Sequence, residues 1–446
     1  MSQGALATII SIILYLSSLF GGSVGPSKAV PPSVSAPAPA ASAQMEPSTT
    51  TTGTGIVTGS TVVVYDAVGS RRQIAELHRG DYVDIMQREG SWYKIRVSTG
   101  EIGYVTAFTL MPTDKKQIDN WSRPTGLATV LGYYLNDSRS PSLPPLLANS
   151  DVLTAIAPWT WEVTAGGNLV ATFDTRDVGA TLKRAGDRGL KTYALIHNFA
   201  IDSSGNHTFN SQLAHKLLSS DTARANLIAN IKRTLTDWRM TGVHIDFEMV
   251  PATDRALLNK FMQDLYETLH PAGFEVTIAV PSKTRESFSD SWAGAYDYKT
   301  LSRYTDQMML MTYDEHWAGG PPGPVASITW VENVVRFALA QGVPADKLVL
   351  GVAAYGYDWP SSGRGRSVTY DRAMSIAEAN GAKIQWDDKA KTPYFRYGNG
   401  RQVWFENRRS LTHKLEIVNK YKLAGISIWR LGQEDPGYWD VLREML

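Results

Sequence analysis

The chain has 446 residues, of which 44 are Lys or Arg and 43 are Asp or Glu, so its formal net charge is +1 at pH 7. So balanced a charge gives no bulk field that would attract nucleic acid or an acidic membrane surface, and we expect no nucleic-acid partner. The chain has no cysteine, which excludes disulfides, thiolate metal sites and a thiol nucleophile. Thirteen Trp and 20 Tyr supply flat apolar surfaces that suit the stacking of neutral sugar rings.

The N-terminus contains an uncharged apolar run at residues 5–20. Its length lies between that of a signal-peptide core and that of a short membrane span, so residues 1–22 are predicted to be a signal peptide or a membrane anchor. Residues 23–53 are rich in Pro, Ala, Ser and Thr and offer little to bury, which predicts a disordered linker. We therefore expect a protein that is secreted or held in the cell envelope, with the membrane as a candidate partner.

Residues 54–112 are predicted to form a small all-β barrel, because short strand-like runs alternate with turn signals. The motifs RGD at 79–81, GSWYKI at 90–95 and GYV at 103–105 resemble the recurring pattern of bacterial SH3-like domains, with Tyr104 in place of the customary Trp. The resemblance implies a module that attaches to peptidoglycan or another wall polymer; a simple spacer is the alternative. A polar joint at 113–124 follows it.

From residue 125 to residue 446, eight apolar strand-like runs alternate with amphipathic segments, which predicts an α/β fold and a (β/α)8 barrel. An open doubly wound sheet is the alternative, but no Gly-x-Gly-x-x-Gly follows a strand. The predicted strands are 127–135, 152–157, 191–196, 242–248, 274–280, 307–312, 348–353 and 425–429.

Two helices are predicted at 221–240, with Asp221 as its N-cap, and at 326–341. The interval between the last two strands is unusually long. Residues 361–406 are predicted to be an α+β insertion with a helix at 370–379 and strands near 383–386, 394–397 and 402–405. Such an insertion would raise one wall of a cleft.

The fourth strand, residues 242–248, alternates apolar and ionisable residues and so places His244, Asp246 and Glu248 on one face. Asp246 and Glu248 are then about 7 Å apart, close enough for each to influence the proton of the other. In a barrel of this kind, functional groups gather at the carboxyl ends of the strands.

This strand resembles the Asp-x-x-Asp-x-Asp-x-Glu signature of glycoside hydrolase family 18, the chitinase-like family. Its last two acidic positions match Asp246 and Glu248, whereas the first two are replaced by Thr241 and His244. Together with Met-Thr-Tyr-Asp at 311–314, the strand looks most like the spore-germination or cortex-lytic branch.

The resemblance implies hydrolysis in which the substrate's own N-acetyl carbonyl is the nucleophile, without a cofactor. It implies that Glu248 is the general acid and then the base, and that Asp246 orients the acetamido group. Tyr313 would hydrogen-bond the same acetamide, and Trp429 would form the floor beneath that sugar.

Further candidates for substrate binding stand at the carboxyl ends of other predicted strands, where aromatic and acidic residues gather. His244 is expected to line the site as well and to hydrogen-bond Asp246, with a charged imidazole lowering the pKa of that carboxyl. The alternative is a histidine whose hydrogen bonds are satisfied within the barrel interior. The other candidates are Tyr134, Trp159, Asp314, Glu315 and Tyr355.

Three other interpretations compete with hydrolysis. His244, Asp246 and Glu248 are all metal ligands by type, but neighbours on one strand rarely converge on one ion, so no metal is expected. A chitinase-like lectin keeps the aromatic cleft and usually loses the acid, which this chain retains. A purely structural pair of interior carboxylates is expensive to bury.

The predicted substrate is a glycan polymer of β-1,4-linked N-acetylglucosamine. The third strand has Leu-Ile-His-Asn at 195–198 where many chitinases have Ser-x-Gly-Gly. The prediction therefore favours peptidoglycan or spore cortex over ordinary chitin.

Overall fold

The computed structural model describes residues 53–57, 61–78, 81–89, 92–97, 99–106, 109–113, 128–172, 175–201 and 207–446. The predicted signal or anchor at 1–22, the linker up to residue 52 and the joint beyond residue 113 lie outside these residues. The chain divides into two compact units, a smaller N-terminal one and a larger C-terminal one. Across the residues described, no helix is both long and apolar enough to cross a membrane.

The smaller unit is a seven-stranded antiparallel sheet with the strand order β3-β2-β6-β5-β4-β1-β7. Its core consists of fully buried aliphatic side chains, among them Val64, Ile95 and Val105. The small all-β region expected from the turn signals is therefore present. Its strands are β1 (Gly53–Val57), β2 (Thr61–Tyr65), β3 (Gln73–His78), β4 (Tyr82–Glu89), β5 (Trp92–Arg96), β6 (Ile102–Thr106) and β7 (Leu110–Thr113).

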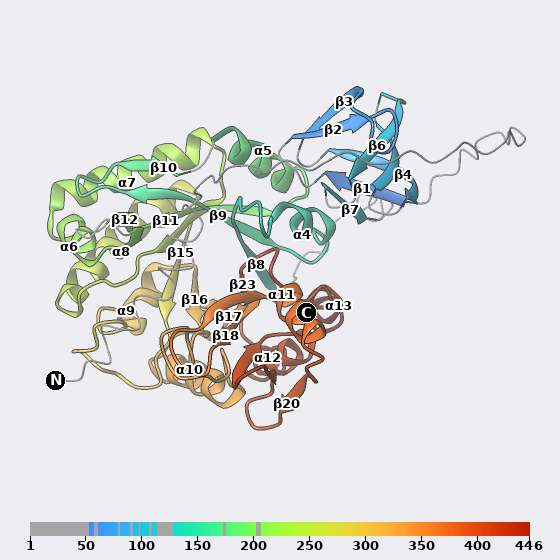
Figure 1. Cartoon of the computed structure of the whole chain (residues 1–446). Helices are drawn as coiled ribbons and strands as arrows, with labels where there is room; N and C mark the ends of the chain where they lie inside the picture. The colour runs from blue at the N-terminus through green and yellow to red at the C-terminus, as the bar shows by residue number, and fades with distance from the viewer. Residues whose placement is uncertain are drawn as a thin grey trace, which may run out of the picture. The chain divides into compact units, whose positions relative to one another are not determined.

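The larger unit is a closed barrel of eight parallel strands, as predicted (Figure 1). β8 pairs with both β9 and β23, so the sheet has no free edge around the barrel. The eight strands are β8 (Thr129–Tyr134), β9 (Ala155–Val163), β11 (Lys191–His197), β14 (Gly242–Asp246), β15 (Glu275–Pro281), β16 (Gln307–Met311), β17 (Leu348–Ala353) and β23 (Gly425–Trp429).

Helices connect successive strands and cover the outside of the barrel (Figure 1). The α-helices of this unit are α4 (Leu143–Ala148), α5 (Thr175–Gly186), α6 (Ser211–Ser219), α7 (Asp221–Asp237), α8 (Arg255–Leu269), α9 (Tyr298–Leu301), α10 (Ile328–Ala340), α12 (Arg408–Tyr421) and α13 (Tyr438–Met445). Short 3-10 turns are η2 (Ala252–Asp254), η3 (His270–Ala272), η4 (Ser302–Tyr304) and η5 (Ala345–Lys347). Small strands β10 (Leu169–Ala171), β12 (Phe199–Ile201) and β13 (His207–Phe209) extend loops.

An α+β insertion follows β17, as expected, but it begins earlier than residue 361 because its first strand starts at Tyr355. Five antiparallel strands have the order β19-β18-β22-β21-β20, and helix α11 (Tyr370–Ala379) packs on them. The strands are β18 (Tyr355–Trp359), β19 (Arg366–Thr369), β20 (Gln385–Asp387), β21 (Thr392–Tyr397) and β22 (Arg401–Phe405).

Three local expectations are corrected. The second barrel strand runs from 155 to 163 instead of 152–157. Helix α7 is capped by Ser220, whose side chain accepts from the Ala223 amide, so Asp221 belongs to the first turn instead of the cap. The fourth strand ends at Asp246, two residues earlier than the alternation suggested.

Gly242 begins the fourth strand where two strands approach closely. A Cβ atom at this position would lie 2.1 Å from the carbonyl oxygen of Glu275 on β15. Because that oxygen belongs to the backbone, the clash could be relieved only by shifting the paired strands. Gly242 therefore fixes the position of the strand that carries Asp246.

We predict that Gly242→Ala lowers the free energy of unfolding by about 1–3 kcal/mol, the usual cost of overpacking. Gly186→Ala is the control, since a Cβ there meets nothing within 4 Å. Chemical denaturation of both variants measures the difference. Equal stability of the two would contradict the close approach.

Candidate active site

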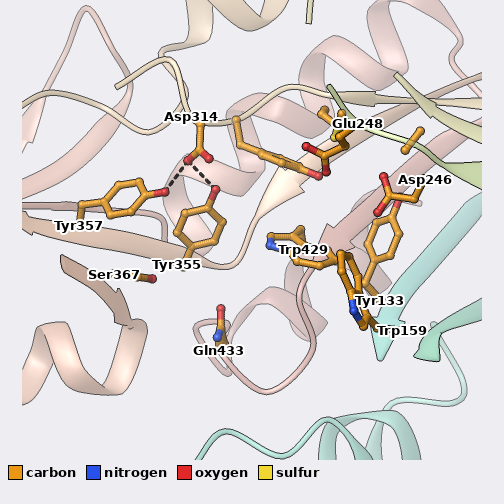
Figure 2. A pocket seen from close by; sticks show the side chains of 13 residues that line it. Tyr133, Trp159, Asp246, Glu248, Asp314, Tyr355, Tyr357, Ser367, Trp429 and Gln433 are labelled. Carbon is orange, nitrogen blue, oxygen red and sulfur yellow. Dashed lines mark hydrogen bonds between the residues drawn. The ribbon is translucent and has the colours of Figure 1, made fainter. Parts of the chain in front are cut away.

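A pocket with about 620 Å³ of empty space opens at the carboxyl ends of the barrel strands (Figure 2). Residues from β8, β9, β14, β15, β16 and β23 and from the segments that follow β14, β16 and β23 meet here, together with residues of the insertion. The pocket is lined by Tyr133, Trp159, Asp246, Glu248, Ala279, Met311, Tyr313, Asp314, Tyr355, Tyr357, Ser367, Trp429 and Gln433.

The position of Glu248 depends on backbone contacts just beyond the end of β14. Asn198, which follows β11, donates from Nδ2 to the Glu248 carbonyl at 2.8 Å and accepts from the Glu248 amide at 2.9 Å. Tyr296 donates its hydroxyl to the carbonyl oxygen of Phe247 at 2.5 Å. These bonds replace strand pairing after Asp246 and hold Glu248 in the same pocket as Asp246.

Asp246 and Glu248 are each only 4% exposed. Burial raises the pKa of both carboxyls, and the charges of Asp246 and Asp314 raise the pKa of Glu248 further. Oε2 of Glu248 has no hydrogen-bond partner within the described part of the chain. The pocket thus contains a buried carboxyl that is biased to keep its proton.

Asp314 is held by two tyrosines of the insertion strand β18. Its Oδ1 accepts from the Tyr355 hydroxyl at 2.7 Å and from the Tyr357 hydroxyl at 2.8 Å (Figure 2). Burial raises its pKa to about 6, while these two bonds act in the opposite direction. Its backbone has a φ of 62°, a left-handed conformation uncommon for residues other than glycine and typical of functional sites.

An aromatic surface forms another side of the pocket. The Trp429 ring lies 5.2 Å from that of Tyr133 and 5.4 Å from that of Trp159. Trp159 stacks in turn on His197 at 4.3 Å. Arg430, which follows Trp429 through a cis peptide bond, is completely buried and forms an ion pair with Asp137 at 2.7 Å. These contacts place a broad apolar face opposite the carboxylates, which suits a sugar ring.

Tyr313 contributes a hydroxyl to the same pocket. Burial and the neighbouring acidic groups and Tyr133 raise its pKa well above the ordinary value, so the hydroxyl stays protonated and can donate a hydrogen bond.

His244 lies beneath the pocket and does not hydrogen-bond Asp246, so that expectation is corrected. Its Nε2 pairs with the Tyr133 hydroxyl at 3.0 Å and its Nδ1 pairs with Thr277 Oγ1 at 2.8 Å. Burial lowers its pKa to about 3, so the imidazole is neutral and carries no charge to lower the pKa of Asp246. Both ring nitrogens are engaged in the barrel interior, so neither can join the carboxylates around a shared ion.

The other predicted site residues divide by location. Trp159, Asp246, Glu248, Tyr313, Asp314, Tyr355 and Trp429 line the pocket. Tyr134 does not: it is buried on the other side of β8, and its hydroxyl accepts from Thr181 of α5 at 3.2 Å. Its neighbour Tyr133 takes the inward position. Glu315 lies in an adjoining pocket, where its Oε2 accepts from the Ser327 amide at 2.7 Å.

Ser367 and Gln433 were not predicted from the sequence, and neither Tyr133 nor Tyr357 was chosen as a site residue. Tyr133 and Tyr357 could have been predicted, since both lie close to the carboxyl ends of predicted barrel strands, where site residues gather. Because both faces of β8 are apolar, alternation could not decide between Tyr133 and Tyr134. Ser367 and Gln433 depend on how the insertion and the last loop fold back, and no local pattern marks them.

The cleft continues into the adjoining pocket, which has about 740 Å³ of empty space and shares Met311, Tyr313 and Asp314 with the first. Its distinctive residues are Trp292, Trp317 and Trp330. Two connected pockets with aromatic walls can accommodate an extended chain of sugar rings better than a single small molecule.

A parallel barrel with buried carboxylates facing aromatic rings at its carboxyl end has the features expected of an enzyme that cleaves glycans. A family model described as "Glycosyl hydrolases family 18" matches residues 200–434. The chain belongs to this family and is a glycoside hydrolase.

Individual proteins agree with this assignment. The Bacillus subtilis protein YdhD is 33% identical over 325 residues, covering 70% of this chain and 74% of that protein. The "Cortical fragment-lytic enzyme" of Bacillus subtilis is 32% identical over 304 residues, covering 66% and 68%. The crystal structure of a chitinase from Chromobacterium violaceum is 30% identical with a TM-score of 0.64, covering 71% of this chain and 98% of that one.

Because Glu248 is buried with a raised pKa, its ionisation opposes folding. A carboxyl of this kind favours the fold below its unfolded pKa, near 4.3, and that contribution is lost as the pH rises above it. We predict that Glu248→Gln raises the free energy of unfolding at pH 8 by about 1–3 kcal/mol, the order of the stability change that one strongly shifted carboxyl produces through its proton.

The gain should shrink below pH 4, where the parent carboxyl is protonated in both states. Urea unfolding at pH 4 and pH 8 measures it, with the exposed Glu444→Gln as the matched control. A Glu248→Gln variant less stable than the parent at pH 8 would show that the ionised carboxylate is favourably solvated.

Proposed function

We propose that the chain hydrolyses β-1,4-linked glycans containing N-acetylglucosamine, with peptidoglycan of the spore cortex as the favoured polymer, by substrate-assisted retaining catalysis. The observation that carries the proposal is the buried Glu248 carboxyl, which retains its proton beside Asp246 and opposite the aromatic face of Trp429. A proton donor next to an anionic group is what cleavage of an N-acetylated sugar requires.

In the first step, the carbonyl oxygen of the substrate's acetamido group attacks C1 of the same sugar. Glu248 gives its proton to the glycosidic oxygen as the C1–O bond breaks, and the leaving sugar departs. The acetamido group becomes a cyclic oxazolinium cation. Asp246 accepts a hydrogen bond from its N–H and stabilises its positive charge, while the Tyr313 hydroxyl donates to the acetamide oxygen.

In the second step, water attacks C1 from the face that the leaving group vacated. Glu248, now a carboxylate, takes a proton from this water, and the bond from C1 to the acetamide oxygen breaks. Two inversions at C1 give net retention, and the enzyme regains its starting protonation. Trp429 supports the apolar face of the sugar throughout.

The choice of polymer is supported by the relative named "Cortical fragment-lytic enzyme". The tryptophan-lined second pocket supports an extended glycan of either kind. Cortex lies in the cell envelope, so we place the action of this chain there or outside the cell. The N-terminal all-β unit, with its SH3-like motifs, would hold the hydrolase on the wall polymer.

Product analysis tests the proposal. The chain is incubated with peptidoglycan fragments and with chitin oligomers, and the products are identified by mass spectrometry and by the anomeric form released. We expect cleavage after N-acetylglucosamine with retention, and a rate at least about 100-fold lower for Glu248→Gln, the usual contribution of a general acid. Glu444→Gln should match the parent.

Tight binding of both glycans without cleavage by the parent would overturn hydrolysis and favour a glycan-binding lectin. Release of the inverted anomer would overturn the substrate-assisted route while leaving hydrolysis in place.

A second prediction concerns pH. The charge of Asp246 raises the pKa of Glu248, so Asp246→Asn should lower that pKa. The alkaline limb of the kcat/KM profile, where Glu248 loses its proton, should therefore move to lower pH, in addition to a lower maximum. The control is Asp388→Asn, whose parent side chain is 84% exposed. An unmoved alkaline limb in Asp246→Asn would show that another group sets it.

A further inference from the structure

A separate groove lies in the insertion, between helix α11 and one face of its sheet, with about 880 Å³ of empty space. Asp358 of β18, Arg366 of β19 and Arg401 of β22 contribute from the sheet, and Arg372 contributes from the helix. We call it the arginine groove. None of these four residues lines the active-site pocket.

The groove carries an excess of positive charge. Asp358 is its single acidic lining residue, and it is already engaged: its Oδ2 accepts from Arg401 at 2.5 Å and from the Tyr397 hydroxyl at 2.8 Å. Arg366 and Arg372 are exposed, and neither side chain has a hydrogen bond or ion pair within the described ranges. Two guanidinium groups therefore remain available in one concave site, and guanidinium binds carboxylates with both nitrogens.

The arginine groove adjoins the active-site pocket. Ser367 lines both cavities, and Figure 2 shows its position beside Tyr357 at the edge of the pocket. In the register of β18 and β19, Tyr357 pairs with Ser367 and Asp358 pairs with Arg366. On β18, Tyr357 therefore lines the active-site pocket, and the next residue, Asp358, lines the arginine groove.

We propose that the arginine groove binds the carboxylates of a peptide attached to the glycan whose sugars occupy the active-site pocket. This inference rests on the proposed function and makes its substrate narrower: a glycan with acidic peptide substituents. Chitin has no carboxylate that could use the groove, whereas peptidoglycan has short peptides on its lactyl groups.

The reach of such a peptide fits the arrangement. Three to four extended residues span roughly 10–14 Å, and Ser367 is a border common to the two cavities that such a peptide would connect. Several carboxylates on one peptide match two free guanidinium groups better than an isolated anion does. The groove would then select substrate without touching the bond that is cleaved.

The test compares three oligosaccharides of equal length: one with peptides intact, the same one after an amidase has removed them to leave lactyl carboxylates, and an N-acetylglucosamine oligomer. Turnover is measured with the full chain, and binding is measured by calorimetry with the chain carrying Glu248→Gln. Both are repeated in the double variant Arg366→Gln/Arg372→Gln. Arg396→Gln is the control, because it removes an exposed arginine of the insertion outside the groove.

We expect the double variant to weaken binding and raise KM about fivefold or more for the peptide-bearing oligosaccharide alone, the scale of two exposed ion pairs, with kcat unchanged. Added salt should reduce the parent's preference. An equal loss on the peptide-free lactyl glycan would transfer the site to the lactyl carboxylate and overturn the peptide proposal. An equal loss of binding on all three oligosaccharides would indicate a structural effect of the substitutions and would also overturn the peptide proposal.

The experiment distinguishes a failure of the proposed hydrolysis from a failure of the proposed peptide binding in the arginine groove. Cleavage by the parent without any effect of the double variant would overturn the groove and leave the hydrolase. A peptide-dependent preference in binding without cleavage would overturn the proposed reaction and leave the groove.

Discussion

The structure depends on keeping two carboxyl groups, Asp246 and Glu248, out of water and within one pocket. Burial is unfavourable for charged groups, and here it is sustained by the closed barrel around them. The two hydrogen bonds between the side-chain amide of Asn198 and the backbone of Glu248 hold the Glu248 backbone in place. The barrel therefore gives up stability at this point and gains a carboxyl that retains its proton where chemistry requires one.

The eight-stranded barrel was predictable because eight short apolar runs alternate with amphipathic segments, the pattern of a parallel sheet covered by helices. The proposed catalytic pair was predictable because Asp246 and Glu248 interrupt one of these runs with ionisable residues. The role of His244 was not, since its partners Tyr133 and Thr277 come from neighbouring strands. Tyr134 was chosen over Tyr133 for a similar reason: two apolar faces hide which one points inward. Ser367 and Gln433 reach the pocket only through tertiary folding.

The insertion contributes to two cavities from one small sheet. Successive residues of β18 face different neighbours, so Tyr357 meets Asp314 while Asp358 meets Arg401. The hairpin of β18 and β19 thus borders two cavities. One is the pocket proposed to act on the sugar, and the other is the arginine groove proposed to bind the peptide on that sugar. This proximity is what connects the proposed reaction with the proposed preference for a peptide-bearing glycan.

The hydrogen bonds from Tyr355 and Tyr357 to Asp314 also bear on how this chain can vary over evolution. An insertion between two barrel strands ordinarily tolerates changes in length, as surface segments do. Here its first strand supplies both donors to a buried acid of the barrel, so deletion would leave that acid without its hydroxyl partners. The insertion and the barrel are consequently coupled through Asp314, so a change that removes β18 also alters the hydrogen bonding of a barrel acid.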